Sequence, residues 1–256
     1  YYEEVVIPPG RSCRLAYDGT SSRWRPTMLP VENYEIERNA IWYDFSAGKF
    51  PEGLQESLWL NYAGSGTVGT AAASSTLPFA AWTLDNAGGA TGDISFYFLR
   101  SVDYFTYTGS THVVSKCAFT THSALSTGSQ RYRIRHIMSG SPASLLTNVN
   151  NTLGIRYSDD INSGKFECYS RNSGGTETTA DSGVTVAAST RYETTITLNK
   201  AGTEATFIIN GAVVARITTN LPSATALGSG IQLGSLIGTG TKTLYVHRMM
   251  AAAIAP

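Results

Sequence analysis

The stretch Ala205-Thr-Phe-Ile-Ile-Asn-Gly-Ala-Val-Val-Ala-Arg-Ile217 predicts a β-hairpin. Apolar and β-branched residues fill both arms, and Asn210-Gly211 supplies the two residues that best tolerate the positive φ angles of a type I′ turn. Earlier strand patterns cover residues 154–158, 165–170 and 192–198, and the polar stretch 159–164 predicts a turn between the first two. From Gly154 onward we therefore expect one strand after another, which is typical of an all-β protein.

The preceding half of the chain continues this pattern. Further strands are expected at residues 57–62, 79–84, 94–99, 112–119, 131–137 and 244–250, with a loop rich in Gly, Ala, Ser and Thr at 63–75. No segment has a helical pattern, and there is no repeat of fixed period. About a dozen strands is the size of a two-sheet antiparallel jelly-roll sandwich with Greek-key connections.

Residues 3–25 are expected to form a smaller β unit. The segment 12–17 alternates, Asp18-Gly19 predicts a turn, and another strand begins at Arg23. So few short strands cannot bury a core alone, so the unit needs an upstream domain or identical neighbours. We expect residues 1–29 to be the last strands of an upstream domain plus a linker, in a C-terminal fragment or a processed chain. Residues 30–256 would then form the jelly-roll domain.

Composition argues against several classes of function. The formal net charge is zero and charged residues make up 15% of the chain, so no nucleic-acid partner is expected. No apolar run approaches the roughly 20 residues of a membrane helix, so no membrane insertion is expected. The three cysteines, Cys13, Cys117 and Cys168, offer neither a disulfide framework nor zinc spacing. Cys117 and Cys168 lie within strand patterns and are expected to be buried.

Several short motifs follow one another along the second half of the chain. They are Gly154-Ile-Arg-Tyr, Gly164-Lys-Phe-Glu-Cys-Tyr, Asp181-Ser-Gly-Val-Thr-Val, Arg191-Tyr-Glu-Thr-Thr-Ile, Ala205-Thr-Phe-Ile-Ile-Asn-Gly and Thr219-Asn-Leu-Pro. Asp44-Phe45 with Leu58-Trp59 fits the opening strands of the same domain. Together these motifs resemble a domain common in bacteriophage tail fibre and tail-tip proteins, which is similar to the concanavalin A-like lectin/glucanase jelly roll. The motifs are structural and specify no ligand.

The resemblance implies a homotrimeric, surface-exposed adhesin, a receptor-binding tip that attaches to a cell-surface polysaccharide or lipopolysaccharide without catalysis. It implies a location in a virion tail fibre, or in an extracellular or cell-surface fibre of phage descent. Two alternatives remain open at this point. The chain can be a purely structural trimerisation module without a ligand, or a glycan-degrading enzyme.

The acidic residues do not form the pattern expected of a glycosidase. Retaining glycosidases need two carboxylates about 5–5.5 Å apart, and the Glu-x-Asp-x-x-Glu arrangement of the glucanase branch is absent. Glu35-Ile-Glu37 is the nearest match but lacks a third acid. Asp159-Asp160 is expected to stabilise a turn, with a calcium site that includes Asn162 as the alternative. The histidines are far apart in the sequence, so we expect no enzyme activity, no metal and no cofactor.

The sharpest candidate for ligand binding is Arg131-Tyr-Arg-Ile-Arg-His-Ile137. Period two places Tyr132, Ile134 and His136 toward the core and the arginines on the opposite face. The same logic exposes Glu167, Tyr169 and Arg171 on a neighbouring strand. Such a face can bind an anionic glycan through bidentate arginine contacts. The proposed glycan-binding residues on it are Arg131, Arg133, Arg135, Tyr169 and Arg171.

Two alternatives accompany this glycan site. The arginines can instead form ordinary cross-strand ion pairs with Glu167 or Glu193, which are common on sheet surfaces. Aromatic rings near a turn are further candidates for stacking on sugars, namely Tyr104 and Tyr107. Packing is the alternative for any single ring.

Overall fold

The structure is a computed structural model of the chain. It describes residues 13–18, 23–28, 40–44, 59–63, 67–71, 81–85, 93–98, 112–140, 149–223 and 227–254. No α-helix is present within these residues, and Asn162–Gly164 form a tight turn whose φ angles are positive. No helix in this described part has the length and hydropathy needed to cross a membrane.

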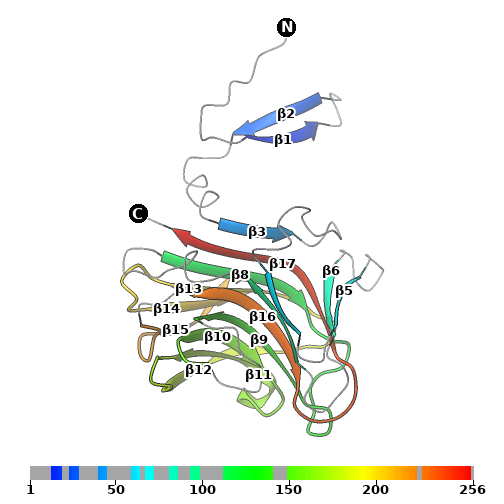
Figure 1. The fold of residues 1–256 in the computed structure, drawn as a ribbon, viewed down its shortest axis with the longest axis vertical. Coiled ribbons are helices and arrows are strands. Elements are labelled where there is room, and N and C mark those ends of the chain that lie inside the picture. The colour runs from blue at the N-terminus through cyan, green and yellow to red at the C-terminus, as the bar shows by residue number, and fades with distance from the viewer. Residues whose placement is uncertain are drawn as a thin grey trace.

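Two antiparallel sheets form the body of the protein (Figure 1). The seven-stranded sheet runs, from edge to edge, β12 (Glu177–Thr185), β11 (Lys165–Arg171), β10 (Thr152–Tyr157), β9 (Tyr132–Ser139), β16 (Gly228–Ser235), β7 (Asp93–Phe98) and β4 (Trp59–Ala63). The eight-stranded sheet runs β15 (Ala212–Ile217), β14 (Ala205–Ile209), β13 (Arg191–Leu198), β8 (His112–Thr120), β17 (Thr243–Ile254), β6 (Ala81–Asp85) and β5 (Thr67–Ala71), and β3 (Ala40–Asp44) also pairs with β17. The predicted all-β, two-sheet architecture is confirmed.

A separate two-stranded sheet is formed by β1 (Cys13–Asp18) and β2 (Arg23–Met28). The strands are antiparallel, with Tyr17 opposite Trp24 and Asp18 opposite Arg23. The two strands predicted on either side of this turn are therefore paired, and residues 19–22 between them lie outside the described residues. Strand β2 continues through Pro26 to Met28 and so takes up most of the end of the 1–29 segment, which was expected to include a linker.

The turns follow the predicted chemistry. Between β14 and β15, Asn210 and Gly211 have φ angles of 50° and 82°, as the Asn-Gly signal requires. The stretch after β10 forms the expected polar turn, in which the Ile161 backbone N–H donates to the Ser158 carbonyl oxygen at 3.2 Å.

Aromatic rings from both sheets contact one another in the core between them. Phe166 of β11 meets Tyr192 of β13 edge-on at 4.9 Å between ring centroids, and Phe119 of β8 at 6.3 Å. Cys117 and Cys168 are buried, as predicted. Burial of each large side chain contributes roughly 1.5–3 kcal/mol, so alternating apolar positions hold the sheets together.

A polar chain crosses this apolar core. His136 of β9 is 1% exposed, and its Nε2 lies 2.7 Å from Ser115 Oγ on β8, in the opposite sheet. Ser115 Oγ also contacts Ser229 Oγ of β16 at 2.5 Å, and His136 Nδ1 lies 2.9 Å from Thr194 Oγ1 of β13. Burial lowers the pKa of His136 to about 3, so the imidazole is neutral.

Three strands were not among those expected, namely β5, β16 and β12, which spans Glu177–Thr185. The stretch 63–75 was expected to be a loop, but residues 67–71 form β5. The strand β16, Gly228-Ser-Gly-Ile-Gln-Leu-Gly-Ser235, was missed altogether. Glycine and serine have low strand propensity, so no local signal marks β16. Hydrogen bonding to β9 on one side and β7 on the other holds β16 in the middle of its sheet.

Candidate functional site

The candidate site is the outer face of the seven-stranded sheet, the face directed away from the core. Apolar residues such as Ile134, Ile155 and Phe166 belong to the core, so the intervening residues of the same strands face outward. Strand register arranges these outward residues in rows that run across the sheet. Two rows contain the charged and aromatic residues that the sequence singled out.

The first, which we call the arginine row, crosses five strands. Its residues are adjacent in register and lie in the order Gln232, Arg135, Arg156, Glu167 and Asp181. Arg135 and Gln232 are 2% and 0% exposed. The prediction that Arg135 lies on the outward face is thus confirmed, but the prediction that it is exposed is wrong.

The second row, the tyrosine row, contains Gly230, Ile137, Gly154, Tyr169 and Thr179. Tyr169 is only 4% exposed, although it was predicted to be an exposed ring. Its ring lies over Gly154, where a Cβ atom would come within 2.4 Å of Tyr169 Cε1. It also packs with Ile137, and the Arg156 guanidinium lies 4.5 Å from the ring centroid. Tyr169 therefore packs into the face, which agrees with the packing alternative.

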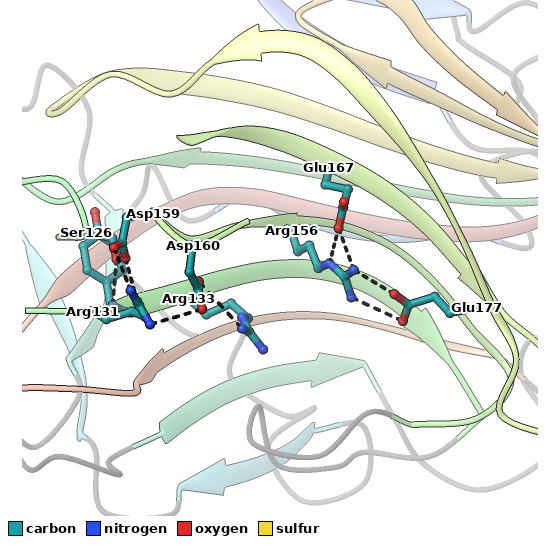
Figure 2. Close-up of polar contacts among 9 residues, drawn as sticks. Ser126, Arg131, Arg133, Arg156, Asp159, Asp160, Glu167 and Glu177 are labelled. Atoms are coloured by element: carbon teal, nitrogen blue, oxygen red, sulfur yellow. Dashed lines mark hydrogen bonds and ion pairs between the residues drawn. The ribbon is translucent and has the colours of Figure 1, made fainter. Parts of the chain in front are cut away.

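Arg156 is the centre of an ion-pair network (Figure 2). Its Nε donates to Glu167 Oε1 at 2.7 Å, and its Nη2 donates to Glu177 Oε1 at 2.7 Å. Burial alone lowers the pKa of Arg156, but the two glutamates outweigh burial and the pKa is raised. The sequence contained this residue in Gly154-Ile-Arg-Tyr, where alternation places it outward, but it was not selected as a site residue.

Arg131 lies at the edge of the face and is also engaged. Its Nε and Nη2 donate to the two carboxylate oxygens of Asp159 at 3.1 and 3.2 Å, and its Nη1 lies 3.3 Å from Asp160. Ser126 Oγ donates to Asp159 as well (Figure 2). Burial raises the pKa of Asp159, but Arg131 and Ser126 outweigh it and hold the pKa below its usual value.

Arg133 differs from these arginines. Its Nη2 lies 4.0 Å from Asp160 Oδ1, beyond hydrogen-bonding distance, and its Nε is buried without a hydrogen-bond partner. Burial and the nearby Arg135 lower the pKa of Arg133, and Asp160 opposes them only in part.

The remaining predicted residues have different outcomes. Arg171 donates to Asn150 Oδ1 at 3.2 Å and lies 3.8 Å from Glu177. Cross-strand pairing is thus confirmed for part of the face. Glu167 forms such a pair, but with Arg156, whereas Arg131 and Arg171 have partners that the sequence did not identify. Glu193 lies on the other sheet and pairs with Arg191 and Arg248. Tyr104 and Tyr107 lie outside the described residues, as does Glu35-Ile-Glu37.

The two carboxylates of the turn after β10 are paired with an arginine. Asp159 and Asp160 both contact Arg131, and Asn162 Nδ2 donates to Asp181 at 2.7 Å. Among the residues that the structure describes, no group of three or more His, Cys, Asp or Glu side chains converges as metal ligands would. The two aspartates of this turn therefore form ion pairs with Arg131.

Comparison with solved structures identifies the fold. Endo-β-1,4-glucuronan lyase from Trichoderma reesei superposes with a TM-score of 0.57 at 12% identity, over 83% of this chain and 94% of that chain. Peanut lectin gives 0.55 at 11% identity, over 85% and 99%. The fold is a concanavalin A-like jelly roll of the lectin/glucanase type. A carbohydrate esterase of the Shiga toxin-encoding bacteriophage phi24B gives 0.53 at 11% identity, over 84% and 98%.

These comparisons correct the expectation of no enzyme activity and narrow what the missing glucanase motif implies. The expectation that the chain is not an enzyme is wrong as an inference from its fold, because the glucuronan lyase and the carbohydrate esterase are enzymes with this jelly roll. The missing glucanase motif bears only on hydrolysis by paired carboxylates. No protein-family model and no curated protein sequence matches the chain.

Proposed function

We propose that this protein binds a cell-surface glycan through the outer face of the seven-stranded sheet. The observation that carries the proposal is the composition of that face. Guanidinium, carboxylate and amide groups of the arginine row lie beside Gly230, which bears no side chain, and beside the Tyr169 ring, which covers Gly154. Sugars present hydroxyl and carboxylate groups that pair with such donors and acceptors. The jelly-roll fold, shared with lectins, is compatible with this use.

The experiment is a binding screen of the purified chain against bacterial polysaccharides, lipopolysaccharides and a glycan array. Binding should weaken in a Thr179→Trp variant, because Thr179 is exposed in the tyrosine row and a bulky ring there obstructs the face. Thr195→Trp is the matched control on the other sheet, where Thr195 pairs with Ile208. Failure to bind any glycan contradicts the proposal, and equal losses in both variants contradict the location.

We further propose that the chain belongs to a homotrimeric fibre of the phage tail-fibre kind, in a virion or at a cell surface. In this proposal residues 1–29 are the end of an upstream neck and residues 30–256 are the receptor-binding jelly roll. The two-stranded sheet of β1 and β2 supports it, because two short strands are not stable alone and gain partners when three copies associate. Light scattering after size exclusion tests the trimer, and a mass of one 27.4 kDa chain contradicts it.

A further inference from the structure

The arginines of the outer face differ in how many of their donors are used. Arg131 and Arg156 each make hydrogen bonds to carboxylates through more than one nitrogen, and Arg171 donates to Asn150. Arg133 makes no such bond. Within the described part of the chain its one ion pair, with Asp160, is 4.0 Å long, and Asp160 lies closer to Arg131. Buried donors without an acceptor are rare in proteins, so the free Nε of Arg133 requires an explanation.

A second buried donor lies beside it. Ser158 follows Tyr157, which pairs with Ile134 of β9, so antiparallel register brings Ser158 next to Arg133. Ser158 is 0% exposed, and its hydroxyl has no hydrogen-bond partner. On the other side of Arg133, β16 places Gly234, which bears no side chain that competes for this position. Continuation of this register thus makes Ser158 and Arg133 neighbours, and each has a buried donor without a hydrogen-bond partner.

The local charge favours an anion. Burial lowers the pKa of Arg133. The positive charges of Arg135 and Arg156 lower this pKa further, and the negative charge of Asp160 opposes them only in part. An incoming negative charge at this point is attracted by Arg133 and Arg135 and opposed by Asp160, whose charge is shared with Arg131. The Arg156 guanidinium contributes less, because it is already paired with Glu167 and Glu177. Figure 2 shows Arg133 at the end of this chain of pairs, next to Asp160.

We propose that Arg133 and Ser158 form a subsite for the carboxylate of a uronic acid in an acidic polysaccharide. The proposal rests on the glycan-binding function proposed above and narrows it to an acidic glycan held at this end of the face. The Nε and Nη donors of arginine form a fork that matches the two oxygens of a carboxylate, and the Ser158 hydroxyl donates a further hydrogen bond. A sulfate ester has similar acceptor chemistry, so the test separates the two groups.

The experiment is calorimetric titration of the full chain with three probes of equal length: an oligouronate, a neutral oligosaccharide and a sulfated neutral oligosaccharide. We expect the oligouronate to bind most tightly. Arg133→Gln should weaken its binding tenfold or more, Arg133→Lys by less, and Ser158→Ala about threefold, since charge-assisted bonds exceed neutral ones. Arg216→Gln, an exposed arginine on edge strand β15, is the matched control and should bind like the unaltered chain.

A direct readout accompanies the titration. The Nε–H resonance of Arg133 should shift in NMR spectra when the oligouronate is added, and the corresponding resonance of Arg216 should not. Circular dichroism checks that each variant folds. If Arg133→Gln does not fold, the binding of Ser158→Ala and the resonance shift of Arg133 test the proposed subsite instead.

The outcomes separate the two proposals. Undiminished oligouronate binding in both Arg133→Gln and Ser158→Ala overturns the subsite and leaves glycan binding intact. Tighter binding of the sulfated probe overturns the assignment to a carboxylate, and tighter binding of the neutral probe overturns an anionic ligand altogether. A crystal grown with saturating oligouronate that shows only water at these two donors also overturns it. If no glycan of any kind binds, both proposals fail.

Discussion

The Tyr169 ring occupies the position that a side chain at residue 154 would take. These residues face each other on β11 and β10, and a Cβ built on Gly154 comes within 2.4 Å of the ring. The glycine thus allows the tyrosine to lie flat beneath the Arg156 guanidinium. Gly154, the Tyr169 ring and the Arg156 guanidinium therefore pack together as one cluster.

Gly154→Ala should therefore displace the Tyr169 ring and lower the free energy of unfolding by about 1–3 kcal/mol, the usual cost of overpacking. Gly128→Ala is the control, because a Cβ there meets no atom within 4 Å, and its effect should stay within about 0.5 kcal/mol. Urea denaturation measures both. In a Tyr169→Ala background the penalty of Gly154→Ala should disappear, and a penalty that persists would show that the ring is not its cause.

Removing the Arg156 guanidinium should be costly because two glutamates depend on it. The side chains of Arg156, Glu167 and Glu177 are 11%, 17% and 20% exposed. Arg156→Met leaves both carboxylates largely buried and close together, and we expect a loss of about 2–4 kcal/mol in stability. Lys165→Met breaks the exposed pair with Asp181 and should cost at most about 1 kcal/mol. Equal losses in the two variants contradict this account.

His136 should make stability depend on pH. Its pKa is about 3 in the folded protein and near 6.5 when unfolded, so between these values the unfolded chain binds one more proton. Stability should therefore fall as the pH is lowered from 6.5, by up to ~1.4 kcal/mol per pH unit for this residue. Denaturation between pH 6 and about 4.5 avoids most carboxylate titration. His136→Asn should be less stable at neutral pH and show a flatter slope, and an unchanged slope contradicts the assignment.

The buried thiols should be unreactive in the native protein. Burial raises the pKa of Cys168 to about 12 and that of Cys117 well above its usual value, and the thiolate is the reactive form. Iodoacetamide at pH 8 should leave the peptides containing both residues unmodified, as measured by mass spectrometry, whereas the chain in urea should be modified at both. Rapid native modification of either cysteine would show that its strand opens readily.

Much of the fold can be predicted from local sequence. The Asn210-Gly211 turn follows from the φ angles that these residues tolerate, and the direction of Arg133, Arg135 and His136 follows from period two. The glycine-rich strand β16 could not be predicted, because its residues favour no strand by themselves. Its neighbours β9 and β7 supply the hydrogen bonds that hold it extended.

The candidate site shows the same division. Alternation alone determined which side chains face away from the core, because that depends only on neighbours along one strand. Register among strands far apart in the chain decides which arginines form ion pairs. It also decides which hydrogen-bond donors lack an acceptor. Arg156 meets Glu167 and Glu177 because three strands align, whereas Arg133 lies beside Gly234 and Ser158 and finds no close acceptor. Side-chain direction is a local property of the backbone, and pairing between strands is a property of the whole sheet.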